Sequence, residues 1–242
     1  MKTIIVTGGA RGIGKAIVYE LAKKNYNVIL NYNKSEEEAI KIKNELSQEG
    51  YNIEIVKADV TIKSQIEQMV EFVLKKYNKI DVLINNAGIS QIKPFADITE
   101  EDFDKIINVN LKSMFYTAQA VLSSMLQQQK GLIINMSSIW GNIGASCEVH
   151  YSTAKAGVNG FTKALAKELG PSNIRVNAIA PGIIDTEMNK HLNDEEIKNI
   201  KNEIPLEKIG KAEEIAKAVR WLVEDEYTTG QIISIDGGWG IN

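Results

Sequence analysis

Short apolar runs alternate with longer amphipathic segments along almost the whole chain, and this alternation limits the possible folds more than any other feature. Strand-like apolar runs lie at residues 2–7, 28–31, 53–57, 80–85, 132–136, 174–179 and 231–235. Segments with apolar residues at helical spacing lie at residues 12–24, 35–49, 62–77, 100–129, 150–169 and 211–224. Such alternation is typical of a parallel sheet covered on both faces. With right-handed crossovers, it predicts an α/β fold with a doubly wound parallel sheet of about seven strands.

The chain is expected to form one domain over residues 1–242. No linker, internal repeat or Pro/Gly/Ser-rich stretch divides it, and its length suits a single core. Residues 183–209 are polar and weakly periodic, and we expect a mobile lid over the substrate there. Ser35, with Glu38 following three residues later, has the form of a capping box, so we expect Ser35 to cap the second helix.

Charge and cysteine content narrow the classes of partner and the location. A net charge of −3 and a pI near 5.6 argue against nucleic-acid binding, which needs a basic face to displace counterions. No apolar run approaches the roughly 20 residues that span a bilayer, so no membrane partner is expected. The single cysteine, Cys147, excludes an internal disulfide and suits a reducing compartment, so the expected location is cytoplasmic. No metal site is expected.

A glycine-rich turn joins the first strand to the first helix. Residues 7–14 have the sequence TGGARGIG, which places glycines where a pyrophosphate can approach bare backbone and a helix N-terminus. A tight turn without a ligand is the alternative, but the position between a buried strand and an amphipathic helix favours a ligand. The residues expected to contact a dinucleotide are Gly8, Arg11, Gly12, Ile13 and Gly14.

The residues after the second strand bear on which nicotinamide cofactor binds. An NAD site usually places an acidic residue there, bonded to the ribose 2′-hydroxyl. Residues 31–35 contain no acid. Arg11 and Lys34 could pair with a 2′-phosphate, although either one alone would be an ordinary surface charge. Together with the missing acid they favour NADP(H), held here by Asn33, Lys34 and Ser35.

Tyr151 and Lys155 lie four residues apart on a predicted helix and therefore on one face. An ammonium beside a phenol favours the phenolate, so Lys155 is expected to lower the pKa of Tyr151 from about 10 toward a range useful for acid–base catalysis. Ser138 ends the fifth strand, and its hydroxyl can hydrogen-bond a substrate carbonyl. Taken singly, the pair could be a surface contact, and Ser137 or Ser138 could cap a strand.

The order and spacing of these residues resemble the short-chain dehydrogenase/reductase family. The glycine pattern is Gly-x-x-x-Gly-x-Gly, and the residues that follow it in the family's order are Asn110, Ser138, Tyr151 and Lys155. The resemblance runs from about residue 3 to residue 238. It implies a Rossmann-type fold, in which Asn110 kinks the long helix and holds a water molecule that passes protons to Lys155.

The resemblance implies further contacts with the cofactor after successive strands. The residues concerned are Asp59 and Val60 after the third strand, Asn86, Ala87 and Gly88 after the fourth, and Pro181, Gly182, Ile184 and Thr186 after the sixth. Asp59 would bond the adenine ring, while Ile184 and Thr186 would hold the nicotinamide carboxamide. From the residues alone, Asp59 could instead cap a helix and Asn86 could shape a turn.

The implied reaction reduces a ketone to a secondary alcohol. Hydride passes from the nicotinamide to the carbonyl carbon, and Tyr151 delivers a proton to the oxygen. Ser138 would stabilise the developing oxyanion, and Lys155 would hold the nicotinamide ribose and tune the tyrosine. Because members of the family are usually tetramers, a homotetramer is implied by analogy.

Across its length the chain looks most like the 3-oxoacyl-[acyl-carrier-protein] reductases of bacterial fatty acid biosynthesis, which implies an acyl carrier protein as partner. Those reductases commonly carry basic residues that meet the acidic carrier. This chain has glutamine at residues 127–129 and serine at Ser172 in those places, although Lys130 and Arg175 are nearby in the sequence.

The segment before Tyr151 adds a second resemblance. Residues 144–149, with the sequence GASCEV, resemble a subgroup assigned to reduction of an aminopentanone group on elongation factor P. A Glu148 carboxylate beside the tyrosine would suit a substrate ammonium, although the helix dipole alone also favours an acid there. His150 is expected to be an exposed residue at the helix start.

An interpretation from another class is a non-catalytic NADP-sensing or scaffold protein on the same fold, because a fold does not determine a function. Such proteins typically lose the catalytic tyrosine or lysine. Tyr151 and Lys155 are both present, so the enzyme interpretation is favoured.

Overall fold

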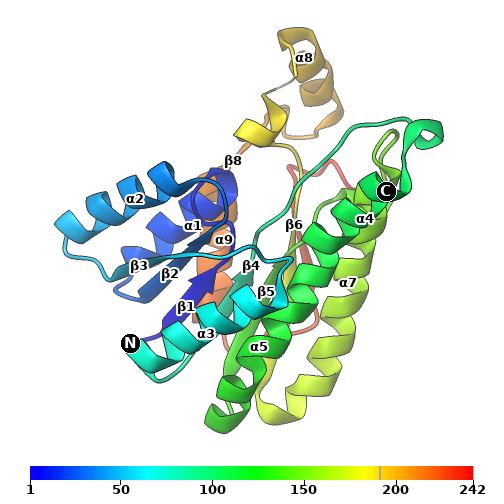
Figure 1. Ribbon diagram of the computed structural model, residues 1–242. Coiled ribbons are helices and arrows are strands. Elements are labelled where there is room, and N and C mark those ends of the chain that lie inside the picture. The colour runs from blue at the N-terminus through cyan, green and yellow to red at the C-terminus, as the bar shows by residue number, and fades with distance from the viewer. Residues whose placement is uncertain (191, 242) are drawn as a thin grey trace.

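A seven-stranded parallel sheet forms the centre of the molecule in this computed structural model, which describes residues 1–190 and 192–241 (Figure 1). The strands lie in the order β3-β2-β1-β4-β5-β6-β9, and every neighbouring pair is parallel. Their bounds are Thr3–Val6 (β1), Asn27–Tyr32 (β2), Ile53–Lys57 (β3), Val82–Asn85 (β4), Gly131–Met136 (β5), Ile174–Pro181 (β6) and Ile232–Ile235 (β9). The predicted doubly wound sheet is confirmed.

Helices cover both faces of the sheet. The helices on one face are α1 (Gly12–Ala22), α2 (Glu36–Gln48) and α9 (Ala212–Glu224). Those on the other face are α3 (Lys63–Tyr77), α5 (Ser113–Gln128) and α7 (Val149–Leu169). Successive residues of a strand point to opposite faces, so Ile4 and Val6 join the first core and Ile5 the second.

The order in which strands are added to the sheet reverses between β1 and β4, which are parallel neighbours at its centre. From β1 the chain continues outward to β2 and β3, and from β4 it continues to β5, β6 and β9. In open parallel sheets, ligands bind at the carboxyl ends of the strands beside such a reversal. The glycine turn follows β1 and residues 86–94 follow β4, so both lie at this edge.

The helix expected over residues 100–129 is interrupted by one wide turn. It consists of α4 (Glu100–Ile107), a π-helical turn (Asn108–Lys112) and α5. π-helical turns are frequent at functional sites because they redirect a side chain. Here the buried Asn110 side chain both accepts a hydrogen bond from Ile89 N (2.9 Å) and donates one to Ile89 O (2.8 Å).

The capping box predicted at the start of the second helix is wrong. Ser35 precedes α2, but its side chain makes no capping hydrogen bond, and its φ of −90° and ψ of 62° differ from the extended backbone of an N-cap. Glu36 pairs instead with Lys57 at 3.0 Å, which ties the helix start to the end of β3.

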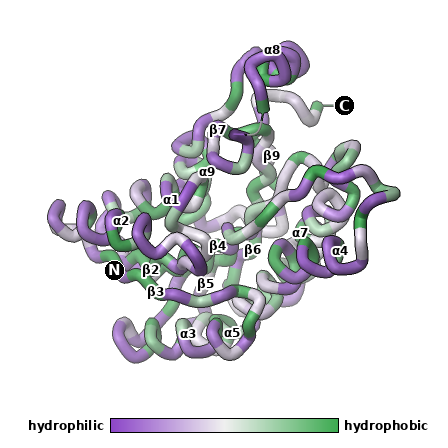
Figure 2. The backbone as a smooth tube through the Cα atoms, turned by 45° about the horizontal axis from the view of Figure 1, so that its top comes forward, coloured by the Kyte–Doolittle hydropathy of each residue, from purple (hydrophilic) through white to green (hydrophobic). Residues whose placement is uncertain are grey.

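The segment 183–209 contains ordered elements that its polar sequence did not reveal. They are β7 (Ile184–Asp185), a 3-10 turn (Glu187–Asn189) and α8 (Asp194–Glu203), and β7 pairs with β8 (Gly210–Lys211). α8 begins with a capping box between Asn193 and Glu196, and it extends away from the sheet as a largely hydrophilic helix (Figures 1 and 2). His191 lies outside the described residues, and the mobility of the lid stays a prediction.

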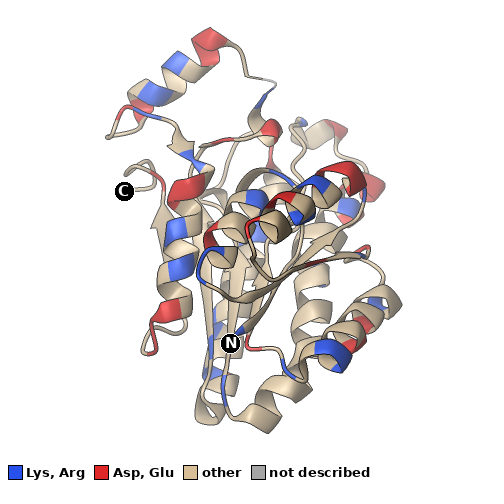
Figure 3. Cartoon of the chain, turned by 90° about the vertical axis from the view of Figure 1, so that its left-hand side faces the viewer, with Lys and Arg blue, Asp and Glu red and all other residues tan. Residues whose placement is uncertain are grey.

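The remaining short elements are α6 (Trp140–Ile143) and two 3-10 turns (Phe95–Asp97 and Gly170–Ser172). On the side of the molecule in Figure 3, basic and acidic residues are interspersed along the outer helices. Within residues 1–190 and 192–241, no helix is both long and apolar enough to cross a membrane.

Candidate active site

The glycine turn after β1 leaves bare backbone beside the start of α1. Gly8 has a φ of +63°, and a Cβ there would lie 2.9 Å from Ala87 Cα. A Cβ on Gly14 would lie 2.2 Å from Gly8 O, so no side chain fits. At Gly12 (φ +51°) a Cβ would meet only Thr186, at 3.5 Å. The turn therefore has the bare helix N-terminus that a pyrophosphate requires, and these residues fit a dinucleotide.

The segment after β4 is docked on the glycine turn. The Asn86 amide donates to the carbonyls of Thr7 and Gly8, both at 3.0 Å. The Thr7 hydroxyl in turn accepts hydrogen bonds from the backbone N–H of Asn86 (3.0 Å) and of Ala87 (3.1 Å). The residues expected to bind the cofactor after β1 and after β4 thus lie together.

The residues expected near the adenosine part of the cofactor lie after β2 and β3. The Asn33 amide donates to the Asp59 carboxylate at 2.8 Å. Burial would raise the pKa of Asp59, but hydrogen bonds from Thr61 and Asn33 and the charge of Lys34 hold it below its usual value. Asn33 and Lys34 are exposed, Ser35 and Ile13 are half-buried, and Val60 is buried.

Arg11 connects the glycine turn to the lid segment. Its guanidinium lies 3.1 Å from the Glu187 carboxylate, and both side chains are about half exposed. Exposed ion pairs of this kind contribute little to stability, so a stronger anion can replace Glu187 as the partner of Arg11.

Lys155 is a buried cation with an unusual set of partners. Its side chain is 4% exposed, and in the described part of the chain its ammonium donates to the Met136 carbonyl at 2.8 Å. The same ammonium lies 5.5 Å from the centre of the Tyr151 ring. Burial lowers the pKa of Lys155 to about 8. The group therefore titrates near neutral pH, unlike a surface lysine.

The pKa of the Tyr151 phenol is raised, mainly by burial and also by the nearby Glu148 carboxylate, while a hydrogen bond with Ser138 acts in the opposite direction. The expectation that Lys155 lowers this pKa is wrong for this structure. The reason is geometric, because the ammonium lies over the ring and donates to the Met136 carbonyl instead of to the phenol oxygen.

The two serines at the end of β5 have different surroundings. The Ser137 hydroxyl donates to the Asn159 side chain at 2.6 Å and is fixed inside the structure. The Ser138 hydroxyl accepts a hydrogen bond from Trp140 N at 3.2 Å and interacts with Tyr151. Because the Ser138 hydroxyl faces Tyr151 and the Ser137 hydroxyl does not, Ser138 is the one placed to donate to a carbonyl oxygen beside the tyrosine.

Gly88 brings Asn110 next to the tyrosine–lysine pair. A Cβ on Gly88 would lie 2.7 Å from the Asn110 side-chain oxygen and 3.7 Å from the Lys155 ammonium. Only a glycine leaves that space open. The structure therefore gathers the expected catalytic set into one cluster of Asn110, Ser138, Tyr151 and Lys155.

The segment after β6 closes the cluster on its other side. Ile139 N donates to the Pro181 carbonyl at 3.0 Å, and Gly182 has no room for a Cβ because Asp236 would lie 2.8 Å away. Ile184 is buried, and the Thr186 side chain faces Gly12 of the glycine turn. The segment expected to hold the nicotinamide thus meets the turn expected to hold the pyrophosphate.

His150 was missed by sequence reasoning. It was expected to be exposed, but its side chain is 0% exposed, and its Nε2 lies 3.0 Å from Gln91 Oε1. Because Gln91 is 59 residues upstream, spacing gave no signal for this contact. The Trp140–Trp239 ring pair, with centroids 4.9 Å apart, was also not predicted.

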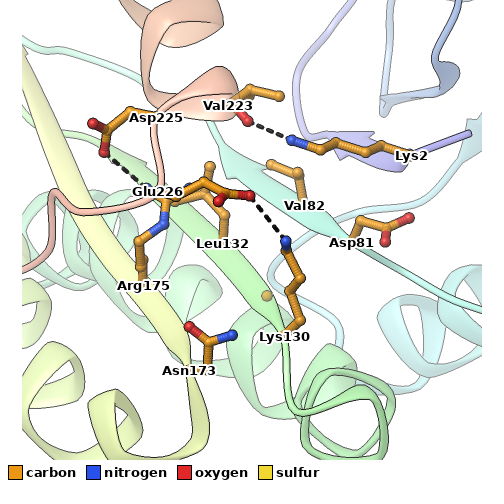
Figure 4. Close-up of a pocket in the computed structure, with 11 residues that line it drawn as sticks. Lys2, Asp81, Val82, Lys130, Leu132, Asn173, Arg175, Val223, Asp225 and Glu226 are labelled. Carbon is orange, nitrogen blue, oxygen red and sulfur yellow. Dashed lines mark hydrogen bonds and ion pairs between the residues drawn. The ribbon is translucent and has the colours of Figure 1, made fainter.

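The amino edge of the sheet holds a cavity of about 140 Å³ (Figure 4). Lys130 lies 3.0 Å from Glu226, and Arg175 lies 3.7 Å from Asp225. Each of these cations thus has a carboxylate beside it. The strands run from this edge toward the Tyr151 cluster. Lys130 and Arg175 therefore lie at the opposite end of this chain's sheet from the candidate active site.

Comparisons with known proteins agree with this geometry. A sequence model described as short chain dehydrogenase matches residues 2–197. Two 3-oxoacyl-[acyl-carrier-protein] reductases named FabG are similar, that of Chlamydia trachomatis with 43% identity (98% of this chain, 96% of the relative) and that of Thermotoga maritima with 42% (98% and 97%). An uncharacterized oxidoreductase of Bacillus subtilis, YmfI, is 38% identical, with 98% of each protein covered.

Solved structures show the same fold over the whole chain. The crystal structure of gox2181 has a TM-score of 0.95 at 32% identity, covering 100% of this chain and 96% of that one. A putative gluconate dehydrogenase from Agrobacterium tumefaciens has a TM-score of 0.95 at 30% identity, with the same coverage. The glycine turn, the gathered side chains and these matches together show that the chain belongs to the short-chain dehydrogenase/reductase family.

Proposed function

We propose that this protein is an NADPH-dependent reductase that converts the ketone of a 3-oxoacyl thioester, carried on an acyl carrier protein, into a secondary alcohol. The observation that carries the proposal is the cluster of Asn110, Ser138, Tyr151 and Lys155 at the carboxyl edge, beside a glycine turn fitted to a dinucleotide. The substrate class is supported by the printed names of the two FabG relatives.

In the proposed mechanism Tyr151 is the proton donor. Its raised pKa keeps the phenol protonated at neutral pH, so the proton is present when the carbonyl oxygen begins to carry charge. The Ser138 hydroxyl donates a hydrogen bond to the same oxygen and stabilises the oxyanion. A nicotinamide bound beside this cluster would supply the hydride for the carbonyl carbon.

Lys155 and Asn110 return the proton to Tyr151. After transfer, the Lys155 ammonium, with a pKa of about 8, gives a proton to the phenolate and regains one from solvent near neutral pH. Asn110 lies across Gly88 from Lys155. In this proposal Asn110 would hold a water molecule that connects the lysine to solvent.

The same residues are proposed to hold the cofactor. The glycine turn with Ile13 would bind the pyrophosphate, Arg11, Asn33, Lys34 and Ser35 the 2′-phosphate, and Asp59 and Val60 the adenine. Asn86, Ala87, Gly88 and residues 181–186 would line the nicotinamide, whose ribose would contact Tyr151 and Lys155. The preference for NADPH over NADH is supported by exposed Arg11 and Lys34 and by the absence of an acid in residues 31–35. A cytoplasmic homotetramer remains part of the proposal.

A second candidate substrate is favoured by one observation. The Glu148 carboxylate raises the pKa of Tyr151 and therefore lies near the phenol, where it could pair with a substrate ammonium. This would suit reduction of an aminopentanone group on elongation factor P. A non-catalytic NADP sensor is the third possibility.

The test is NADPH oxidation by the purified protein with a short 3-oxoacyl thioester, with NADH and the Tyr151→Phe variant as controls. The proposal expects fast oxidation that needs the tyrosine and is slower with NADH. Cofactor binding without thioester turnover would contradict it, and elongation factor P carrying the aminopentanone would then be tried. Binding without turnover of either substrate would favour the sensor.

A further inference from the structure

The segment after β4 is hydrogen-bonded at every second residue to the π-helical turn, to α7 and to the turn before α7. Ile89 is bound by the Asn110 side chain, and Gln91 by the His150 ring. The backbone N–H of Lys93 donates to the Cys147 carbonyl at 2.7 Å. Gly88, which lies between Asn110 and Lys155, is part of the same segment, so a shift of the segment would disturb the catalytic cluster.

A continuous series of hydrogen bonds joins Lys93, Asp102, Gln91 and His150. The Lys93 ammonium donates to Asp102 Oδ2 at 2.6 Å, and the Gln91 amide nitrogen donates to Asp102 Oδ1 at 2.8 Å. The pKa of Asp102 is held well below its usual value, first by Lys93 and then by Gln91, so the carboxylate only accepts. The start of α4 is thereby joined to Gln91.

The hydrogen bonds from Asp102 through Gln91 determine which nitrogen of His150 carries its proton. Since the Gln91 nitrogen must face the Asp102 carboxylate, the amide oxygen of Gln91 faces His150 Nε2 at 3.0 Å. An oxygen acceptor requires an N–H partner, so Nε2 is protonated. In the neutral ring Nδ1 is then an unprotonated acceptor.

His150 Nδ1 is buried and, within residues 1–190 and 192–241, has no hydrogen-bond partner. A second proton there would create a buried charge and an N–H with no acceptor in the described residues. The pKa of His150 is accordingly lowered, first by burial and then by Lys93, while Asp102 acts against them. Glu148, the residue just before α7, is a further acid two positions from His150 in the sequence.

We propose that neutral His150 is a positioning residue. Its hydrogen bond with Gln91, called the lock below, fixes the segment after β4 to the start of α7 and so holds Gly88 and Tyr151 in place relative to each other. The inference deepens the proposed function and rests on it. It further implies that a second proton on His150 weakens the lock, because the Nδ1–H that it creates has no acceptor in the described residues at this buried position.

The test compares substitutions at both ends of the His150–Gln91 contact. His150→Leu and Gln91→Leu each remove the contact, and kcat/KM for the 3-oxoacyl thioester should fall about 10- to 100-fold, as expected for small misplacements of catalytic groups. The dissociation constant for NADPH should change little. The double variant should be no worse than either single variant, because both break the same lock.

Two matched controls separate positioning from folding. His150→Gln places an amide N–H toward the Gln91 oxygen and should restore most of the activity that His150→Leu loses. Thr153→Ala alters an exposed residue on the same helix and should have wild-type kinetics. A second proton on the buried Nδ1 would have no acceptor in the described residues, so kcat/KM of the wild type should fall at acidic pH. Because burial lowers the pKa of His150, this fall should come at a lower pH than the usual histidine pKa, and it should be absent in His150→Gln.

Wild-type kcat/KM and an unchanged pH profile in His150→Leu would overturn the inference, as would a His150→Gln variant as poor as His150→Leu. If His150→Leu does not fold, Gln91→Leu and His150→Gln still decide the question. An inactive wild-type protein would instead overturn the proposed function, so the two failures are distinguishable.

Discussion

The two edges of the sheet differ in how their cations are paired. The cations at the amino edge lie beside carboxylates, whereas the buried cation at the carboxyl edge bonds a backbone carbonyl. At the amino edge, the Lys130 ammonium lies 3.0 Å from the Glu226 carboxylate, and Arg175 lies 3.7 Å from Asp225. At the carboxyl edge, the buried Lys155 ammonium donates to a backbone carbonyl instead of a carboxylate. Buried polar groups without full compensation cost stability, and they are retained where chemistry uses them.

The pKa values at the carboxyl edge show what this imbalance achieves. Burial and Glu148 raise the pKa of Tyr151, while burial lowers that of Lys155 to about 8. Environments that move two neighbouring pKa values apart assign different roles to the two groups. In the proposed mechanism, the phenol of Tyr151 keeps its proton until transfer, and Lys155 exchanges protons near neutral pH.

The largest effect is expected at Tyr151. Replacing it by phenylalanine removes the proton donor but keeps the ring, so kcat/KM should fall about 10²- to 10⁴-fold while NADPH binding persists. Stopped-flow oxidation and fluorescence titration of NADPH measure the two quantities. A variant that retains wild-type turnover would assign the proton transfer to another group.

A smaller effect is expected at Arg11. Replacing it by alanine breaks its exposed pair with Glu187 and removes a charged partner for the 2′-phosphate. The Michaelis constant for NADPH should rise about tenfold or more, as for loss of a charge-assisted hydrogen bond, and that for NADH should change little. Equal changes for both cofactors would mean that the 2′-phosphate binds elsewhere.

The smallest effect is expected at the amino edge. Lys130→Ala removes an exposed ion pair with Glu226, so the melting temperature and the kcat should both stay within error of the wild type. Differential scanning calorimetry and the reductase assay check this. A clear loss of activity would show that the amino edge takes part in the reaction and would end the contrast between the edges.

Much of the fold follows from the sequence, because buried parallel strands are continuous apolar runs bounded by turns. That Asn110, Ser138, Tyr151 and Lys155 lie together was also predictable, since their order and spacing resemble those of the family, while their catalytic roles stay a prediction. In contrast, α8 has no buried residue among its described positions and depends on the Asn193 capping box, so hydrophobic spacing gave no signal for it.

Contacts between distant segments were beyond sequence reasoning. The Arg11–Glu187 pair joins residues 176 positions apart. His150 is polar and near a helix start, which is typical of an exposed residue, yet it is buried and contacts Gln91. Likewise, the effect of Lys155 on Tyr151 depended on where the ammonium points, which spacing on a helix does not determine.

The most direct test of the contrast between the edges is the free energy of unfolding of Lys155→Met, measured with urea at pH 7. Because the folded-state pKa of about 8 lies below the usual 10.5, the unfolded chain binds this proton more tightly. The resulting cost to folding is full below pH 8 and fades as the pH rises toward 10.5. We predict that the inactive variant is more stable than the wild type by about 1–3 kcal/mol at pH 7. A variant less stable than the wild type would contradict the account, because Lys155 would then be part of what holds the fold together.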